Sequence, residues 1–165
     1  MNKLKSELIS FLSDDARYSS EQLSFMTGAS VKDVEKAVSE LEKDGVIVKY
    51  SAIVNTEAMA ELNKKVQALI EVKVAPQKLK GFDSYAEEIY NFSEVQSLYL
   101  MSGGFDLAVF VEGKDITDIA RFVSEKLSVI DGINSVQTHF ILKKYKIEGH
   151  VAKPSDESKR QIIQA

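Results

Sequence analysis

The most unusual local feature of the sequence is Ser102-Gly103-Gly104-Phe105-Asp106, in which two adjacent glycines lie between two predicted strands. Glycine adopts positive φ at little steric cost and lets another group approach the backbone closely. Free N–H groups in such a turn would bind a carboxylate as a backbone nest does, and the carboxylate of Asp106 would accept hydrogen bonds from an ammonium group. Together these groups would suit an amino acid, although the five residues taken alone favour an ordinary hairpin turn.

The other polar residues do not form a catalytic or metal-binding pattern. The two histidines, His139 and His150, are too far apart for a helical metal pair, and a lone histidine in a predicted strand favours a packing or interface role. The sequence has no phosphate-binding loop, nucleophile elbow or dinucleotide fingerprint. It also has no cysteine for a disulfide, a thiolate metal site or a nucleophile. We therefore expect neither an enzyme nor a bound metal or cofactor.

Three short helices are predicted in the N-terminal part of the chain. Apolar residues recur at helical spacing in the stretches 4–12, 23–26 and 31–41. In the second stretch the expected apolar contacts are Leu23 and either Phe25 or Met26. Serine is a typical helix cap and glycine typically follows a helix end. The residues at those positions are Ser19 or Ser20, Gly28, Ser30 and Gly45.

A tight turn around Gly28-Ala29 joins the second and third helices, which is the outline of a helix-turn-helix. In such a unit the third helix would enter the major groove of DNA. A three-helix bundle without a DNA role fits the spacing equally well. After the third helix, short strands are expected at 46–48 and 53–54, followed by a partly helical connector at 55–65.

Beyond residue 65, predicted strands and helices alternate. The expected strands are 66–74, 95–101, 107–111 and 133–145, and the expected helices are 82–90 and 116–130. This β-α-β-β-α-β order is that of a ferredoxin-like fold, so the fold class of the chain is α+β. Right-handed crossovers would place both helices on one face of a four-stranded antiparallel sheet. The other face would be uncovered and partly apolar, which favours self-association.

The overall composition is ordinary for a globular protein. The chain has 165 residues, of which 44% are hydrophobic, and it contains neither an apolar run of about 20 residues nor a secretory leader. A cytoplasmic protein without membrane contact is therefore expected. The formal charge of −4 and the pI near 5.3 argue mildly against nucleic-acid binding, because phosphate contacts supply most non-specific affinity. A locally basic surface, or several weak DNA-binding units joined together, would remove that objection.

Motifs in both halves of the chain carry a resemblance to a known family. Those in the N-terminal half are Leu12-Ser13-Asp14-Asp15-Ala16-Arg17-Tyr18-Ser19, Leu23, Gly28, Ser30, Val34, Val38, Leu41-Glu42, Gly45-Val46-Ile47 and Tyr50-Ser51-Ala52-Ile53-Val54. Those in the C-terminal half are 101–107 and 135–146. In this order and separation they make the chain resemble the Lrp/AsnC family of bacterial and archaeal regulators over residues 1–149.

The resemblance implies a winged or plain helix-turn-helix domain at 1–54, a linker at 55–65, a RAM-type domain at 66–149 that senses ligands and forms oligomers, and a tail at 150–165. It also implies that the partners are double-stranded DNA, an amino acid or similar small effector, and further copies of the chain. Family members form homodimers by packing their RAM sheets face to face, and the dimers assemble into higher oligomers. Family effectors bind near the glycine-rich turn, which points to Ser102, Gly103, Gly104, Phe105 and Asp106, with Thr138 as a further candidate.

The third predicted helix departs from the family pattern. Family members usually carry basic side chains along this helix, whereas here Lys32 and Lys36 stand among several acidic residues, and residues 1–50 contain seven basic and nine acidic side chains. Carboxylates that face phosphates lower DNA affinity. We still expect sequence-specific DNA binding, through Arg17, Ser30, Lys32, Lys36, Ser39 and Lys49. The alternative is an oligomeric ligand-binding protein of the same fold that has lost DNA binding.

Overall fold

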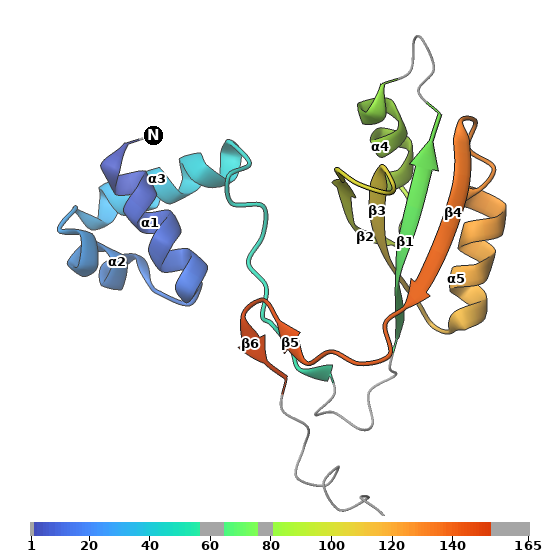
Figure 1. Cartoon of the computed structure of the whole chain (residues 1–165). Helices are drawn as coiled ribbons and strands as arrows, with labels where there is room; N and C mark the ends of the chain where they lie inside the picture. The colour runs from blue at the N-terminus through green and yellow to red at the C-terminus, as the bar shows by residue number, and fades with distance from the viewer. Residues whose placement is uncertain (1, 57–64, 76–80, 153–165) are drawn as a thin grey trace, which may run out of the picture. The chain divides into compact units, whose positions relative to one another are not determined.

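The computed structural model describes residues 2–56, 65–75 and 81–152 of the chain. The chain divides into two compact units, Met1–Val54 and Asn55–Ala165, and each is described by itself (Figure 1). Most of the expected connector 55–65 and of the expected tail 150–165 lies outside the described residues. Within the described ranges, no helix is both long enough and apolar enough to cross a membrane.

The N-terminal unit contains the three expected helices: α1 (Lys3–Asp14), α2 (Ser20–Thr27) and α3 (Val31–Lys43). Ser19 forms a capping box with Gln22 at the start of α2, and the hydroxyl of Ser30 accepts a hydrogen bond of 3.2 Å from the N–H of Asp33 in α3. Gly28 ends α2 with a φ of 72°, in the left-handed region. The predicted caps on both sides of the turn are therefore confirmed.

The core of this unit is small and comes from all three helices: Leu8, Leu23, Val34, Ala37 and Leu41. The expected packing of Phe25 or Met26 is wrong, because α2 is short and buries a single side chain, that of Leu23. Phe25 is 91% exposed. The short strands expected at 46–48 and 53–54 are also wrong, because this described segment is not paired with a strand and only Ile47 packs against the core.

The C-terminal unit has the expected ferredoxin-like arrangement. All strand pairings of its sheet are antiparallel, in the order β2-β3-β1-β4. The elements are β1 (Val66–Val74), α4 (Phe82–Tyr90), β2 (Val95–Leu100), β3 (Leu107–Gly113), α5 (Ile116–Phe122), the π-helical turn η2 (Val123–Leu127) and β4 (Ile133–Phe140).

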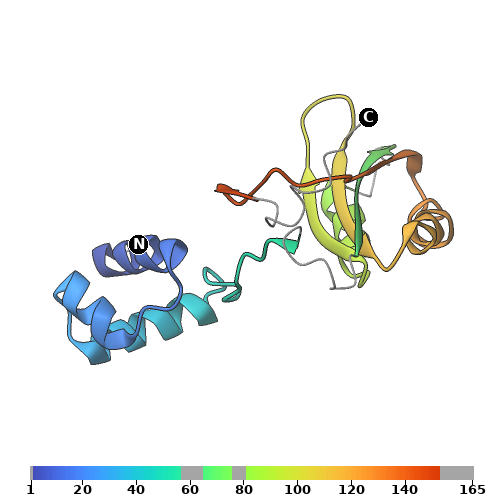
Figure 2. The same ribbon diagram turned by 90° about the horizontal axis from the view of Figure 1, so that it is seen from below.

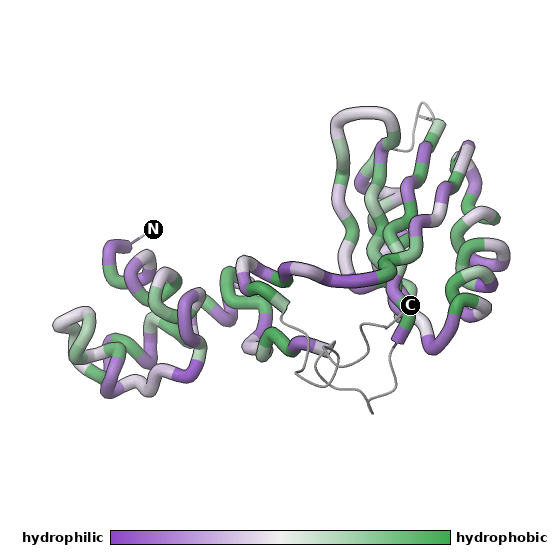
Figure 3. Tube along the Cα trace, turned by 60° about the horizontal axis from the view of Figure 1, so that its bottom comes forward, coloured by the Kyte–Doolittle hydropathy of each residue, from purple (hydrophilic) through white to green (hydrophobic). Residues whose placement is uncertain are grey.

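The two faces of this sheet differ in what covers them. On one face, fully buried residues of β1 such as Ile70 pack with Tyr85 of α4 and Phe122 of α5, and Figure 3 shows apolar and polar residues alternating along the strands. On the other face, Leu69 of β1 lies in register with Phe110 of β3. No helix in the described part of this unit packs against that face, so the expected open and partly apolar surface is present.

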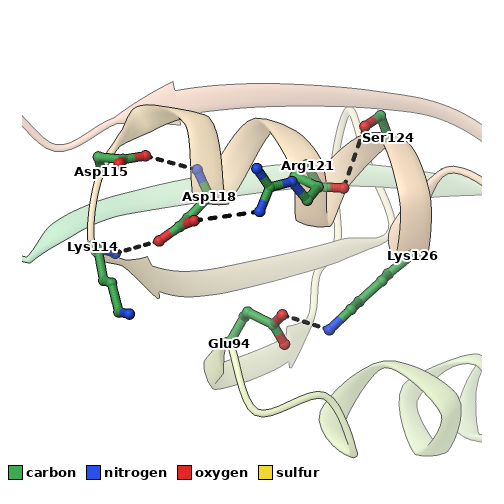
Figure 4. Close-up of polar contacts among 7 residues, drawn as sticks. All are labelled: Glu94, Lys114, Asp115, Asp118, Arg121, Ser124 and Lys126. Atoms are coloured by element: carbon green, nitrogen blue, oxygen red, sulfur yellow. Dashed lines mark hydrogen bonds and ion pairs between the residues drawn. The ribbon is translucent and has the colours of Figure 1, made fainter.

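Polar side chains hold the segment from α5 to η2 in place (Figure 4). The carboxylate of Asp115 accepts a hydrogen bond of 2.9 Å from the N–H of Asp118 and caps α5. The Nζ atom of Lys126 lies 2.6 Å from Oε1 of Glu94, which precedes β2. This hydrogen bond lowers the pKa of Glu94. The helical segment ends at Leu127, so the expected range 116–130 is too long at its C-terminal end.

The last strand is shorter than expected. A single strand was predicted from 133 to 145, but β4 ends at Phe140, and Leu142 is 93% exposed. The chain then forms a small hairpin from β5 (Lys146–Ile147) and β6 (His150–Val151). Its two turn residues, Glu148 and Gly149, have φ values of 44° and 83°, and a type I′ hairpin turn requires such a pair of positive φ values.

Candidate nucleic-acid interface and glycine-rich turn

The first candidate site is the exposed face of α3. The buried stripe of this helix points into the core of the N-terminal unit. Because an α-helix has 3.6 residues per turn, Lys32, Lys36 and Ser39 lie on the side opposite that stripe. All three side chains are exposed. The structure therefore brings three of the expected DNA contacts together on one helical face.

Two acidic side chains of α3 are held by partners within the same unit. The carboxylate of Glu40 lies 2.9 Å from the Nζ atom of Lys5 in α1; the hydrogen bond between them lowers the pKa of Glu40 and raises that of Lys5. The carboxylate of Asp33 accepts a hydrogen bond of 2.6 Å from the hydroxyl of Ser30 at the start of the helix. Both carboxylates therefore already have a bonded partner within the N-terminal unit.

A third acidic side chain of α3 is also paired. The hydroxyl of Tyr50 donates a hydrogen bond of 2.9 Å to Glu42, and burial together with this carboxylate raises the pKa of Tyr50. Glu35 differs from the other three, because its exposed carboxylate has no hydrogen bond or ion pair to any described residue. Sequence reasoning missed the partners of Glu40 and Glu42 because Lys5 and Tyr50 both lie outside α3, and helical periodicity does not show which side chains beyond a helix contact it.

The remaining expected DNA contacts are placed differently. The hydroxyl of Ser30 serves as the N-cap of α3, which limits it as a base contact. The guanidinium of Arg17 makes two hydrogen bonds to Asp15, of 3.0 Å from Nε and 2.8 Å from Nη2, and this pairing lowers the pKa of Asp15 to about 2. The side chain of Arg17 is still 90% exposed. Lys49 is exposed in the segment that follows α3.

The second candidate site is the turn between β2 and β3, seen as the yellow loop that projects beyond its strands in Figure 2. Gly103 has a φ of 149°, which favours glycine, whereas Gly104 has no positive φ. A Cβ atom on either residue would meet nothing within 4 Å. The backbone at this turn is therefore accessible from outside, and Ser102 beside it is exposed.

Asp106 has a structural role in addition to any ligand contact. Its Oδ2 atom accepts a hydrogen bond of 2.9 Å from the N–H of Val74, and its own N–H donates one of 3.0 Å to the carbonyl of Val72. Through these two bonds, Asp106 extends the contact between β1 and β3 beyond Val72 and Leu107, the last residues paired between these two strands. One carboxylate oxygen accepts a bond in this way, and Oδ1 has no hydrogen-bond partner among the described residues.

The structure does not bring Thr138 to the turn within one chain. Thr138 lies on β4 in register with Ile70 of β1, whereas the turn joins β2 to β3. Because the sheet order is β2-β3-β1-β4, strand β1 lies between them. Phe105, in the turn itself, is half-buried.

The structure adds two features that the sequence did not predict. A surface cavity of about 300 Å³ lies between α4 and β2, with Phe82, Ala86 and Leu98 among its apolar walls and Asp83 and Gln96 among its polar ones. On the open sheet face, the Nε2 atom of His139 lies 3.3 Å from Oε1 of Glu71.

Among the residues that are described, no cluster of three or more His, Cys, Asp or Glu side chains could hold a metal ion.

A helix-turn-helix unit and a ferredoxin-like unit in one chain define a class of transcriptional regulators, and sequence similarity agrees. The family model of the Lrp/AsnC ligand binding domain matches residues 67–151. The chain is also 42% identical over 163 residues to the uncharacterized HTH-type transcriptional regulator YugG of Bacillus subtilis, covering 99% of this chain and 98% of that protein. The protein belongs to the Lrp/AsnC family.

Solved structures show the same fold over most of the chain. The leucine response regulatory protein of Mycobacterium tuberculosis has a TM-score of 0.71 at 22% identity, covering 89% of this chain and 96% of that one. A transcriptional regulator of Neisseria meningitidis in complex with L-Met has a TM-score of 0.64 at 22% identity, covering 96% of this chain and 99% of that one. These similarities confirm the two-part architecture.

Proposed function

We propose that this Lrp/AsnC regulator binds double-stranded DNA by placing α3 in the major groove. Lys32, Lys36 and Ser39 are the groove contacts, while Arg17 and Lys49 are contacts to the phosphate backbone. One observation carries this proposal: the two lysines share an exposed helical face, while three of the four acidic residues of α3 are held by partners in their own unit. A protein that works on DNA in this way would be cytoplasmic.

The same observation weakens the alternative of an oligomer that no longer binds DNA. That alternative rested on the excess of acidic residues in the first 50 positions. A carboxylate that is paired with an ammonium group, as Glu40 is with Lys5, presents less negative charge to a phosphate than an isolated carboxylate does. The negative charge of one of the four acidic residues of α3 is therefore offset by a neighbouring positive charge.

The test begins with DNA fragments selected by the purified protein from genomic DNA, followed by binding titrations on an enriched fragment. Replacing both Lys32 and Lys36 by Glu should lower affinity by roughly 100-fold, because each reversal removes a groove contact and places a negative charge close to the phosphates that line the groove. The matched control, Lys114→Glu with Lys143→Glu, makes the same charge change in the other unit and should leave most of the affinity. Equal losses in both variants would contradict the proposed interface.

We further propose that an amino acid binds at the glycine-rich turn, with its carboxylate on the backbone N–H groups near Gly103 and Gly104 and its ammonium group on Oδ1 of Asp106. The accessible backbone of the turn and the single unoccupied oxygen of Asp106 support this assignment. Ser102 and Phe105 flank the ligand. Thr138 would contribute only from a neighbouring subunit, since β1 separates it from the turn in one chain.

Calorimetric titration with each of the common amino acids tests this site. Asp106→Asn keeps an oxygen that accepts the N–H of Val74 but removes the charge, so the tightest ligand should bind roughly 10-fold more weakly, as expected for a lost charge-assisted hydrogen bond. Asp83→Asn removes an exposed carboxylate elsewhere in the unit and should not change the affinity. The assignment fails if no amino acid binds to the wild type, or if Asp106→Asn binds the tightest ligand with the same affinity as Asp83→Asn.

The open sheet face is the proposed dimer surface, and dimers would assemble further into higher oligomers. Leu69, Phe110 and Tyr99 supply its apolar part, and the rings of Tyr99 and Phe110 are in edge-to-face contact at 5.9 Å. Phe110→Arg should convert the dimer to a monomer in sedimentation velocity, because a charge would be buried without a partner. Ile116→Arg, an exposed position on α5, should leave the mass unchanged.

A further inference from the structure

Glu35 is the acidic residue of α3 that differs from the others. Its carboxylate is exposed and has no bonded partner among the described residues, whereas Asp33, Glu40 and Glu42 each have one. A carboxylate left near phosphates weakens DNA binding. An unpaired acid at this position therefore reduces non-specific affinity unless it has a favourable contact of its own in the complex.

The position of Glu35 suggests what that contact is. Residues three and four apart on a helix are neighbours, so Glu35 lies beside Lys32, one turn earlier, and beside Ser39, one turn later. It also falls in the N-terminal half of α3, the part of a recognition helix that reaches base edges. Its side chain is thus at the edge of the groove-facing surface and within reach of bases.

Only one base presents a group in the major groove that matches a lone carboxylate. Cytosine offers the N4 amino group as a donor and no acceptor, whereas guanine offers two acceptors, and glutamate accepts from cytosine N4. Adenine also has an amino donor, but its N7 acceptor beside it would repel a carboxylate. The lysines next to Glu35 suit guanine, which carries O6 and N7 acceptors.

We propose that Glu35 is a specificity-determining residue that accepts a hydrogen bond from the N4 amino group of a cytosine in the operator. This inference rests on the proposed placement of α3 in the major groove. Glu35 lowers affinity for DNA in general and recovers it only where a cytosine is present. The residue thus increases the ratio of specific to non-specific binding.

The inference makes opposite predictions for two substitutions. Glu35→Ala removes the carboxylate, so the cytosine preference at one position should be lost and non-specific affinity should rise. Glu35→Gln creates a side chain that bonds the N6 and N7 atoms of adenine in bidentate fashion, so the preferred base at that same position should change from cytosine to adenine. Discrimination at that base pair should be about 10-fold in the wild type.

The experiment is selection from a randomised duplex library, sequenced after binding, with the full-length wild type, Glu35→Ala, Glu35→Gln and a control. The control is Glu42→Gln, which makes the same charge change on the same helix at a residue held by Tyr50. Thermal unfolding of each variant shows that the fold is kept. In the control, overall affinity should change slightly and the base preferences should not change at all.

A cytosine in the wild-type consensus that disappears in Glu35→Ala and becomes adenine in Glu35→Gln supports the inference. A wild-type consensus that survives unchanged in both variants overturns it while leaving the proposed DNA binding intact. A change in Glu35→Gln that Glu42→Gln reproduces also overturns it, because the effect would then be one of charge alone. A wild type that enriches no sequence contradicts the proposed function itself, and the inference falls with it.

Discussion

The exposed face of α3 and the turn between β2 and β3 both carry carboxylates, but these carboxylates differ in what they leave available to a partner. On α3, the ammonium group of Lys5 offsets the charge of Glu40, whereas Asp33 and Glu42 are bonded by neutral hydroxyls and keep their negative charge. At the turn, Asp106 keeps its negative charge but directs one of its oxygens to the N–H of Val74, so the other oxygen, Oδ1, is the one without a bonded partner in the described part of the chain. The comparison shows that residue type alone does not give the charge that a site presents, because the bonded partner of each carboxylate also decides it.

The largest effect that would sharpen this comparison is expected at the turn. Gly103→Val places a β-branched residue at a φ of 149° and should cost about 1–3 kcal/mol in the free energy of unfolding. Gly104→Ala is the matched control, since Gly104 has no positive φ and its new Cβ atom would meet nothing within 4 Å. Urea denaturation measures both. Equal destabilisation would show that the turn does not need the conformation described.

A smaller effect is expected where Ser30 caps α3. Ser30→Ala removes the acceptor for the N–H of Asp33 and should lower the free energy of unfolding of the N-terminal unit by about 1 kcal/mol. Ser39→Ala, at an exposed position on the same helix, should have almost no effect on stability. Circular dichroism melts give both values. A reversed order would mean that Ser30 is not the cap.

The Asp15–Arg17 pair should show a weak dependence of stability on pH. The pKa of Asp15 is lowered from 3.8 to about 2 in the folded chain. The stabilisation from this pair is therefore present above about pH 4 and is lost as the pH falls toward 2. Asp15→Asn should remove this part of the acid sensitivity, measured as the difference in melting temperature between pH 5 and pH 2.5. An identical difference in both proteins would contradict the pairing.

The smallest effect is expected for Glu40→Gln, which leaves Lys5 without its main partner. Exposed ion pairs contribute little to stability, so the melting temperature should hardly change. DNA affinity should change less than it does for Glu35→Ala, because Glu40 already has a positive partner. A larger gain in DNA affinity for Glu40→Gln than for Glu35→Ala would show that pairing with Lys5 does not reduce the effect of Glu40 on DNA binding.

Features that depend on neighbouring residues were predictable from the sequence. Ser19, Gly28 and Ser30 act within three or four positions of themselves, and they mark the ends of α2 and the start of α3 correctly. The alternation along β1 and the order of the later elements also identified the sheet and its covered face. These signals are local in sequence. A chain in which each helix and strand must bury one apolar face can adopt few folds that agree with all of them.

Features that depend on distant contacts were not predictable. Glu40 is offset by Lys5 of α1 and Glu42 is bonded by Tyr50 beyond the helix, and Asp106 bonds a backbone group on another strand. The end of β4 was missed because apolar residues continue past Phe140, so the periodicity gives no stop. Packing by Phe25 or Met26 was expected for a similar reason, since hydrophobicity alone does not show which side of a short helix is covered.

The salt dependence of DNA binding tests the central claim most directly. Affinity for an enriched fragment would be measured at several salt concentrations for the wild type and for Lys32→Ala with Lys36→Ala. If α3 faces DNA, the double variant should bind more weakly, and the slope of log affinity against log salt should decrease in magnitude by about one unit for each lysine near a phosphate. An unchanged slope and affinity in a folded double variant would show that the wild type contacts DNA through another surface.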